Sequence, residues 1–401
     1  MEGIGPGSIE LFLNRDFVVE AASVDGQNAH FSWGDPDHKL PYVTVARALN
    51  VVPSAACVGA CKVRLRYAGR LPDVVAEVNM VRPHLVELAA YAAYYPVPPN
   101  IGRFPFTGRF TMPDSFTVVS RGERLQAATD HGWRTEIWRA SIPGVDIPTV
   151  ASDELHTRSV REGDVEVSVF FRDLEPRLAE DALREAAASL KYLTHEFGST
   201  PATALRLVFS PREGWGYSRT GLIVVSEQRH LRRSAEEASG GPPDQNVHGN
   251  AHEISHFWWH VASTQSSDDW INEALAEYSA VVDSRRRGGA STYRSWAARY
   301  LDSLRSKAPP VGIVQTRADS TFRYVNWYER GALFFMCLEA RYGHDVLHRA
   351  LAEILHLGRA RAVTTADLHA SLARAGIGES WVRAWLEEPG MAQPEACVPG
   401  L

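Results

Sequence analysis

Two histidines four residues apart, followed by a glutamate in the next predicted helix, constrain the fold of this chain more than any other feature. The segment NAHEISHFWWHVAS contains His252 and His256, and sixteen residues separate His256 from Glu273 in the segment WINEALAEYSA. Side chains four residues apart share one helix face, so both imidazoles can reach one metal ion. A carboxylate from a second, antiparallel helix would complete three ligands and leave a fourth position open, as in catalytic zinc sites. We therefore expect the fold to bring these two helices together.

The residue types in this segment also predict a cofactor and a base. Two neutral imidazoles and one carboxylate suit zinc, so one Zn2+ per chain is expected, although cobalt or manganese could substitute. Glu253 directly follows His252 and would point beside the metal toward a water, where it could act as general base. A motif of five residues also arises by chance. The alternative is a helix with two half-buried histidines.

Two neighbouring residues compete for a role at this site. His260 continues the histidine series, but on a straight helix it would lie about 12 Å along the axis from His252, at ~1.5 Å per residue. That is too far to share one ion, so we expect it outside the ligand set. Glu277 lies one turn after Glu273 and is expected to accept a hydrogen bond from a ligand imidazole. An ordinary solvated glutamate is the alternative, and both interpretations of Glu277 stay open.

The composition excludes some classes of partner. The 401 residues are 45% hydrophobic and 22% charged, with a net charge of −6. This balance is typical of a globular protein, and it provides no basic excess for binding nucleic acid. The first residues, SIELFLNRDFVVEAASV at 8–24, alternate apolar and polar side chains. They lack the apolar run of a signal peptide or membrane span, so no membrane association and a cytoplasmic location are expected.

Four cysteines are too few for a disulfide scaffold. Cys57 and Cys61 are close enough in sequence to bind a metal or to pair, but no second pair of cysteines or histidines nearby completes a zinc site. We therefore expect reduced structural thiols.

The hydrophobic pattern changes near residue 155. Before it, short runs alternate apolar and polar residues between frequent turn signals, as in Val63, Leu65 and Tyr67, which predicts an antiparallel β domain over 1–155. After it come a strand over 165–171, an amphipathic helix from Pro176 to just before Gly198, and strands at 205–210 and 222–226. Beyond the glycine- and proline-rich turn at 240–243 the chain is expected to be mostly helical. The predicted class is α+β with two domains, 1–155 and 156–401.

At these motifs the sequence resembles the aminopeptidase N family of gluzincin zinc metallopeptidases, which includes leukotriene hydrolase. HEISH and WINEALAEY match the family's two ligand helices, and NWYERGALFFMCLEARYG resembles its tyrosine segment. The resemblance implies a thermolysin-like, mostly helical catalytic domain over 156–401, in a short form without the large C-terminal helical domain of many members. It also implies that Tyr328 is the catalytic tyrosine that stabilises the oxyanion. Arg330 stands where the family usually has lysine.

The chain departs from the family in two places. The interval between His256 and Glu273 is shorter than usual, which predicts a shortened loop between the helices. The segment PREGWGYSRTGLIVVSE at 211–227 lies where the family has a strand whose glutamate binds the free amine of the substrate. Arg219 occupies this segment, and its charge would repel an ammonium group and attract a carboxylate or phosphate. In the alternative, Arg219 points to solvent and Glu213 or a carboxylate of the β domain binds the amine.

The resemblance implies a peptide or small amide as substrate and three possible functions. The first is an aminopeptidase-like zinc peptidase. The second is a peptide or amide hydrolase that needs no free amino terminus, which the missing glutamate favours. The third is an inactive scaffold that binds a peptide or protein, against which the intact ligands, base and tyrosine argue. Neither nucleic acid nor a membrane is expected as a partner, and the sequence does not determine the oligomeric state.

Overall fold

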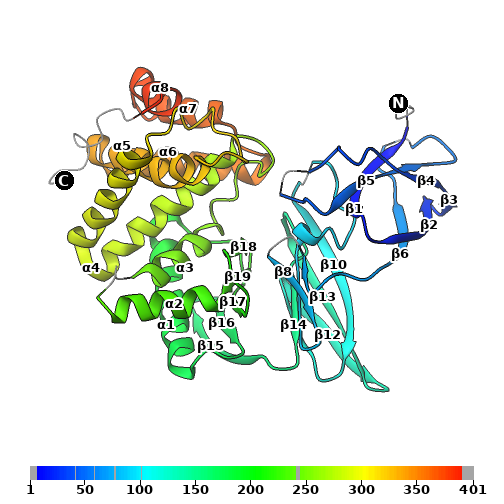
Figure 1. The fold of residues 1–401 in the computed structure, drawn as a ribbon. Coiled ribbons are helices and arrows are strands. Elements are labelled where there is room, and N and C mark those ends of the chain that lie inside the picture. Colours follow the sequence, from blue (N-terminus) through cyan, green and yellow to red (C-terminus); the bar gives the residue numbers. More distant parts are fainter. Residues whose placement is uncertain are drawn as a thin grey trace. The chain divides into compact units, whose positions relative to one another are not determined.

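The computed structural model describes residues 7–40, 42–57, 59–75, 78–100, 102–240 and 244–390, and the chain divides into two compact units (Figure 1). The first comprises the chain through Leu155 together with Arg212–Trp215, and the second comprises His156–Pro211 and the chain from Gly216 onward. Most of the predicted turn at 240–243, and the end of the predicted helical region at 391–401, lie outside the described residues.

The described strands of the first unit form four antiparallel sheets. Two have three strands each, in the orders β1 (Ile9–Asn14), β5 (Ala46–Val52), β4 (His30–Trp33) and β3 (Gln27–Asn28), β2 (Val18–Val24), β6 (Val63–Ala68). A five-stranded sheet has the order β11 (Thr117–Ser120), β14 (Thr149–Ser152), β9 (Leu85–Leu88), β8 (Asn79–Arg82), β7 (Val74–Val75). The fourth joins β10 (Phe104–Pro113), β13 (Trp133–Gly144) and β12 (Glu123–Asp130). Burial alternates along β6 as the sequence pattern predicts.

Arg212 explains why a short later segment belongs to the first unit. Its Nε donates to both carboxylate oxygens of Glu87, at 3.1 and 3.2 Å, and its guanidinium also donates to the carbonyl of Trp215 at 2.6 Å. Both members of the ion pair are almost completely buried, so the segment is held by a charge-assisted pair that water does not screen.

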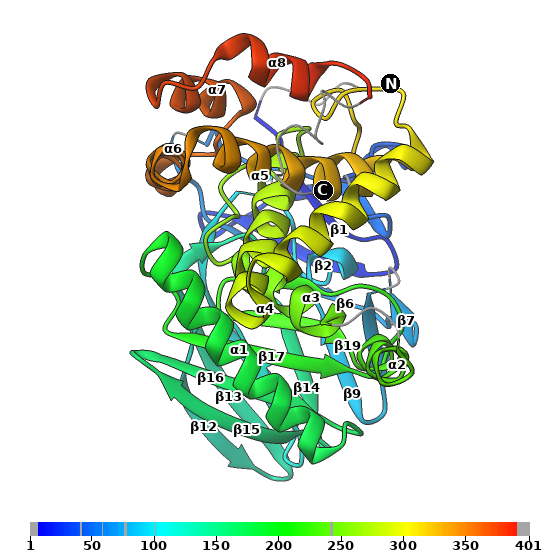
Figure 2. The same cartoon turned by 90° about the vertical axis from the view of Figure 1, so that its left-hand side faces the viewer.

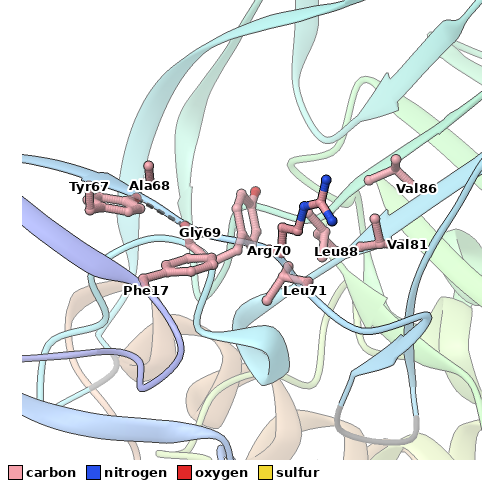
Figure 3. Close-up of a pocket in the computed structure, with 10 residues that line it drawn as sticks. Phe17, Tyr67, Ala68, Gly69, Arg70, Leu71, Val81, Val86 and Leu88 are labelled. Atoms are coloured by element: carbon pink, nitrogen blue, oxygen red, sulfur yellow. Dashed lines mark hydrogen bonds between the residues drawn. The ribbon is translucent and has the colours of Figure 1, made fainter.

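The first unit also contains an open cavity of about 630 Å³. Most of the side chains that line it are apolar, and Arg70 is a charged one (Figure 3).

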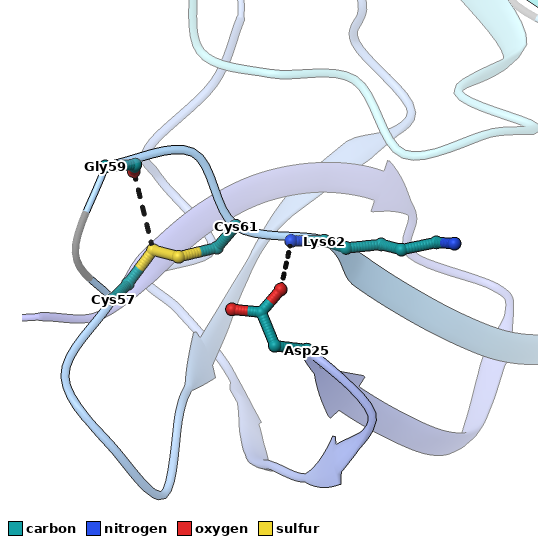
Figure 4. The surroundings of a disulfide bond; sticks show 5 residues. All are labelled: Asp25, Cys57, Gly59, Cys61 and Lys62. Atoms are coloured by element: carbon teal, nitrogen blue, oxygen red, sulfur yellow. Dashed lines mark hydrogen bonds between the residues drawn. A yellow bond between two sulfur atoms is a disulfide. The ribbon is translucent and has the colours of Figure 1, made fainter.

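The expectation of reduced thiols at Cys57 and Cys61 is wrong in this structure, which pairs the two residues as a disulfide (Figure 4). Their Cα atoms lie 6.0 Å apart, within the range that a disulfide spans. The backbone N–H of Lys62 donates to the carboxylate of Asp25 at 2.8 Å and so attaches this loop to the turn between β2 and β3. Structural disulfides occur mainly in oxidising compartments, so the cytoplasmic location remains only a prediction.

The second unit is built on a mixed five-stranded sheet. Its order is β15 (His156–Glu162), β16 (Val165–Phe171), β17 (Ala204–Ser210), β19 (Leu222–Ser226), β18 (Tyr217–Arg219). β16, β17 and β19 are parallel, whereas β15 and β18 pair antiparallel at the two edges. Helix α1 (Pro176–Phe197) connects β16 to β17 and runs across the sheet (Figure 2). It begins at Pro176 and is followed by Gly198, as predicted.

Helices make up most of the remaining second unit, which confirms the predicted order of β structure followed by an α+β and then helical region. They are α2 (Glu227–Ala238), α3 (Gln245–Ser255), α4 (Asp269–Lys307), the π-helix η2 (Tyr324–Arg330), α5 (Gly331–Tyr342), α6 (His344–Ala360), α7 (Thr365–Arg374) and α8 (Glu379–Glu387). In both views α3 and α4 lie between the sheet and α5–α8 (Figures 1 and 2). One continuous apolar core joins the sheet to these helices. None of the described helices is both long enough and apolar enough to span a membrane.

Candidate metal centre and active site

The loop between α3 and α4 sets how the two helices meet. Helix α3 ends at Ser255, with His256 as its C-cap residue, and α4 begins at Asp269. Asn272, in the first turn of α4, accepts a hydrogen bond from the backbone N–H of Ala262 at 2.9 Å and donates to its carbonyl at 3.1 Å. This two-way pairing of a buried amide with a loop peptide anchors the loop to the helix that carries Glu273.

His252, His256 and Glu273 converge on one point. The Nε2 atoms of both histidines lie 3.5 Å from Oε2 of Glu273, and the three ligand atoms are all within 4.8 Å of one another. A tetrahedral zinc ion about 2.1 Å from each ligand would hold such atoms roughly 3.4 Å apart. Oε2 of Glu273 is buried and has no hydrogen-bond partner among the described residues, and a buried carboxylate oxygen without a donor is costly. The three ligand atoms therefore fit a zinc ion.

Glu277 orients the first of these histidines. Its Oε2 accepts a hydrogen bond from Nδ1 of His252 at 2.7 Å, while its Oε1 accepts from Nε2 of His248 at 2.9 Å and from the hydroxyl of Tyr300 at 2.5 Å. Burial alone would raise the pKa of Glu277, but the charge of His248 and hydrogen bonds from both histidines hold it well below its usual range. The hydrogen bond of Nδ1 with Glu277 leaves Nε2 as the ring nitrogen directed toward Glu273, on the side where a metal would bind.

Three residues that are hydrogen-bonded to Glu277 or Glu273 were not identified from the sequence, namely His248, Tyr300 and Arg323. His248 lies one turn before His252, so the same spacing that identified the pair would have found it. Tyr300 lies 23 residues after Glu277, and nothing in the local pattern links them. Arg323 donates from Nη2 to Oε1 of Glu273 at 3.3 Å, across 50 residues of sequence. These two contacts depend on tertiary packing.

Glu253 lies on α3 beside the ligands. A Cβ at position 216 would lie 3.0 Å from Oε1 of Glu253, so the glycine leaves room for this carboxylate next to strand β18. Burial raises the pKa of Glu253, whereas the charges of His252, His256 and Arg219 lower it. A desolvated carboxylate close to the ligand set has the position and the raised proton affinity that a general base needs.

The ring of Tyr328 packs against that of His252. The two rings stack with centroids 5.4 Å apart. Tyr328 belongs to the π-helix Tyr324–Arg330, a rare form that occurs often at functional sites. Burial, and then the charge of Glu273, raises the pKa of Tyr328 well above its usual range. The hydroxyl therefore keeps its proton and can donate it in a hydrogen bond.

The structure places Arg219, Glu213 and Arg330 in three different surroundings. Arg219 is at the end of edge strand β18, where it donates to the carbonyl of Ser218 at 2.7 Å, and its charge acts on Glu253. Glu213 is exposed and belongs to the first unit, so it is not among the residues that the second unit brings together. Arg330 is buried and donates to the carbonyls of Trp385 and Glu388, both at 2.7 Å, which directs it to the end of α8.

His260 stays outside the ligand set, but the reason differs from the one predicted. Helix α3 ends at Ser255, so His260 is not on a continuation of its face. The chain turns after His256 and stacks the ring of His260 on that of His256, with centroids 4.5 Å apart.

Comparison with known proteins gives matches of structure but not of sequence. Neither a protein-family model nor a curated protein matches the sequence. Solved structures do match. One is an M1 zinc metallopeptidase from Deinococcus radiodurans, a variant bound to a Tyr-Ser-Ala substrate. It aligns with a TM-score of 0.76 and 20% identity, over 97% of this chain and 88% of that chain.

The chain shares the fold of these metallopeptidases. The unsubstituted enzyme from Deinococcus radiodurans aligns with a TM-score of 0.76 and 20% identity, over 96% of this chain and 86% of that chain. A two-domain M1 zinc metallopeptidase variant bound to L-tryptophan aligns with a TM-score of 0.75 and 18% identity, over 98% and 89%. The α+β class predicted from the sequence, with an antiparallel β domain before a mostly helical one, is thus confirmed.

Proposed function

We propose that this protein is a zinc-dependent hydrolase of peptide or amide bonds, with the metal on His252, His256 and Glu273. One observation carries the proposal: two imidazole Nε2 atoms each lie 3.5 Å from a buried carboxylate oxygen that lacks a donor among the described residues. The shared fold of the M1 zinc metallopeptidases supports it, and so does the resemblance at HEISH, WINEALAEY and the tyrosine segment.

The residues around the ligands have complementary roles in this proposal. Zinc, when bound, would act as a Lewis acid toward the scissile carbonyl and make a water at the site acidic near neutral pH. Glu253 would accept the proton of that water and pass it to the leaving amine. Tyr328 would donate a hydrogen bond to the oxygen on which negative charge develops. Glu277 would keep His252 in the tautomer that presents Nε2.

A test of the proposal is the substitution Glu253→Gln. The variant should retain its fold and zinc but lose activity on a peptide library by about 100- to 10,000-fold, which is the usual contribution of general acid–base catalysis.

Tyr328→Phe should likewise retain zinc and lower kcat more than it raises KM, because the hydrogen bond of the tyrosine strengthens as the oxyanion forms.

Glu387→Gln, an exposed glutamate on α8, serves as the matched control and should leave activity unchanged. Zinc binding without hydrolysis of any peptide by the unsubstituted protein would favour the alternative of an inactive scaffold. An unchanged kcat in Tyr328→Phe would remove that tyrosine from the mechanism.

We propose further that the enzyme does not require a free amino terminus. Arg219 stands in the edge strand beside Glu253, where a cation repels an ammonium group. Peptides with an acetylated amino terminus should therefore be cleaved with a kcat/KM at least equal to that of the free peptides, and Arg219→Glu should improve cleavage of simple amino-acid anilides. A strong preference of the unsubstituted enzyme for the free amine would return it to ordinary aminopeptidase specificity.

A further inference from the structure

Helix α2 carries two arginines whose charges are not balanced within the described part of the second unit. Arg229 and Arg233 are one turn apart on α2 and therefore share one face. No described carboxylate forms an ion pair with either guanidinium. Burial, and then repulsion by Arg229, lowers the pKa of Arg233 to about 10. Glu236 and Glu277 attract Arg233 from a distance, but Glu277 is already hydrogen-bonded to His248, His252 and Tyr300.

Arg233 contacts the helix that carries the proposed base. The Nη1 atom of Arg233 donates to the carbonyl of Gln245 at 3.2 Å, and it would lie 3.0 Å from a Cβ at position 249. The amide of Asn246 donates to the carbonyl of His230 and to the hydroxyl of Ser234, both at 2.9 Å, and so anchors α2 to α3. Gly249 precedes Glu253 by four residues and shares its helix face. The guanidinium of Arg233 thus lies along α3, one turn from Glu253.

Tyr324 lies beside the stacked rings of the candidate site. Its ring stacks on that of Tyr328 with centroids 4.9 Å apart, and Tyr328 stacks in turn on His252. The side chain of Tyr324 is 53% exposed, so one ring face is available to a ligand. Burial raises the pKa of Tyr324, while the charges of Arg229 and Arg233 act against this rise. The charges of both arginines therefore act on the hydroxyl of Tyr324.

We propose that Arg229 and Arg233, with Tyr324 beside them, form a subsite that binds a carboxylate of the peptide substrate near the reacting bond. A half-buried guanidinium without a carboxylate partner is stabilised by an incoming anion, and the planar fork of arginine matches a carboxylate with two parallel hydrogen bonds. The proposal rests on the peptidase function proposed above, and it names a substrate class for that site. The carboxylate is either an acidic side chain or the free carboxyl terminus of the substrate.

The test uses the zinc-loaded full chain and matched peptides. Pairs differ by Glu against Gln at each residue flanking the cleaved bond, and each is made with a free and an amidated carboxyl terminus. The carboxylate-bearing member should have a kcat/KM about 10- to 100-fold higher, the range expected for hydrogen bonds to a charged group. Loss of the difference on amidation alone would assign the subsite to the carboxyl terminus. A difference only between Glu and Gln would assign it to a side chain.

Arg233→Gln should abolish this preference by lowering kcat/KM of the carboxylate-bearing peptide far more than that of the neutral, amidated peptide. Arg233→Lys should retain part of the preference, because it keeps the charge but not the fork. Arg232→Gln is the matched control, since Arg232 is exposed on the same helix, and it should leave the preference unchanged. Equal kcat/KM for charged and neutral peptides in the unsubstituted enzyme would overturn the subsite, as would an equal loss on both in Arg233→Gln.

Failure of the proposed function gives a different result. If the zinc-loaded protein hydrolyses no peptide, the same peptides are titrated into it calorimetrically. Tighter binding of the carboxylate-bearing member, lost in Arg233→Gln but not in Arg232→Gln, would support the subsite without catalysis. Equal binding of both members would overturn it.

Discussion

The two glutamates of α4 present their oxygens to different kinds of partner. Each oxygen of Glu277 accepts a hydrogen bond from a histidine. Glu273 receives a hydrogen bond from Arg323 at Oε1, and its Oε2 lacks a donor among the described residues. A carboxylate whose hydrogen bonds are complete can orient a neighbour, whereas one with a buried, unsatisfied oxygen is suited to bind a cation directly. This difference supports the proposal that Glu273 binds the metal and that Glu277 orients its histidine ligand.

Substitution of each glutamate should separate these roles. Glu273→Ala should abolish stoichiometric zinc binding, since it removes one of three ligands. Glu277→Ala should weaken zinc affinity by about 10- to 100-fold, because the orientation of His252 is lost while all three ligands remain. Zinc content and competition with a chelator measure both effects. Asp302→Ala, at an exposed acidic residue on the same helix, should change neither. Full occupancy in Glu273→Ala together with complete loss in Glu277→Ala would reverse the two assignments.

At the level of elements, the break in α4 brings distant residues back to the site. Tyr300 follows Glu277 by 23 residues, which on a straight helix would place them roughly 34 Å apart at ~1.5 Å per residue. Their side chains are nevertheless hydrogen-bonded. The helix is interrupted at Gly289, where φ is 64° and ψ is −155°, a conformation almost restricted to glycine. Its second half folds back, and Trp296 stacks on His248 with centroids 3.6 Å apart.

Gly289→Ala should therefore affect both stability and the metal site. A side chain at this backbone conformation should lower the free energy of unfolding by about 1–3 kcal/mol, as measured by denaturant titration. Zinc affinity should fall as well, because Tyr300 would no longer be held at Glu277. Ser295→Ala, at an exposed position of the same helix, should change the free energy of unfolding by no more than about 0.5 kcal/mol. Unchanged stability and zinc affinity in Gly289→Ala would contradict this role of the break.

At the level of the whole molecule, the proposed metal site and the four antiparallel sheets of the N-terminal region belong to separate compact units. All three proposed ligands lie in the second unit, whose apolar core is continuous from the sheet through α8. The first unit has its own, smaller apolar clusters. A ligand that binds one folded unit stabilises that unit by mass action, so zinc should act on the second unit in particular.

Removal of zinc by a chelator should lower one thermal transition and leave the other in place. At free zinc a thousand times its Kd, the ion would contribute about 4 kcal/mol, or roughly 10 °C in Tm for a unit of this size. This stabilisation should also weaken as the pH falls, because protons compete with zinc for the ligand atoms. Calorimetry with and without chelator measures it, with His252→Ala as a zinc-free control. An equal shift of both transitions would contradict the assignment of zinc to the second unit.

The sequence by itself determined the features that depend on local periodicity. The two-residue alternation before residue 155 predicted antiparallel strands, and the four-residue spacing of His252 and His256 predicted that both imidazoles would face one point. Strand β17 (Ala204–Ser210) and helix α1 begin and end within a residue of their predicted bounds. These features are readable because the faces of a strand or helix follow from backbone geometry within one element.

Only the tertiary structure decided which of these faces meet. The hydrogen bonds of Tyr300 with Glu277 and of Arg323 with Glu273, and the approach of Arg233 to Gly249, join residues from separate elements or from the two halves of a broken helix. The disulfide at Cys57 and Cys61 likewise depends on how a loop brings two Cα atoms within 6.0 Å. Such pairings have no sequence period, because chain reversals and the packing of a shared core determine them.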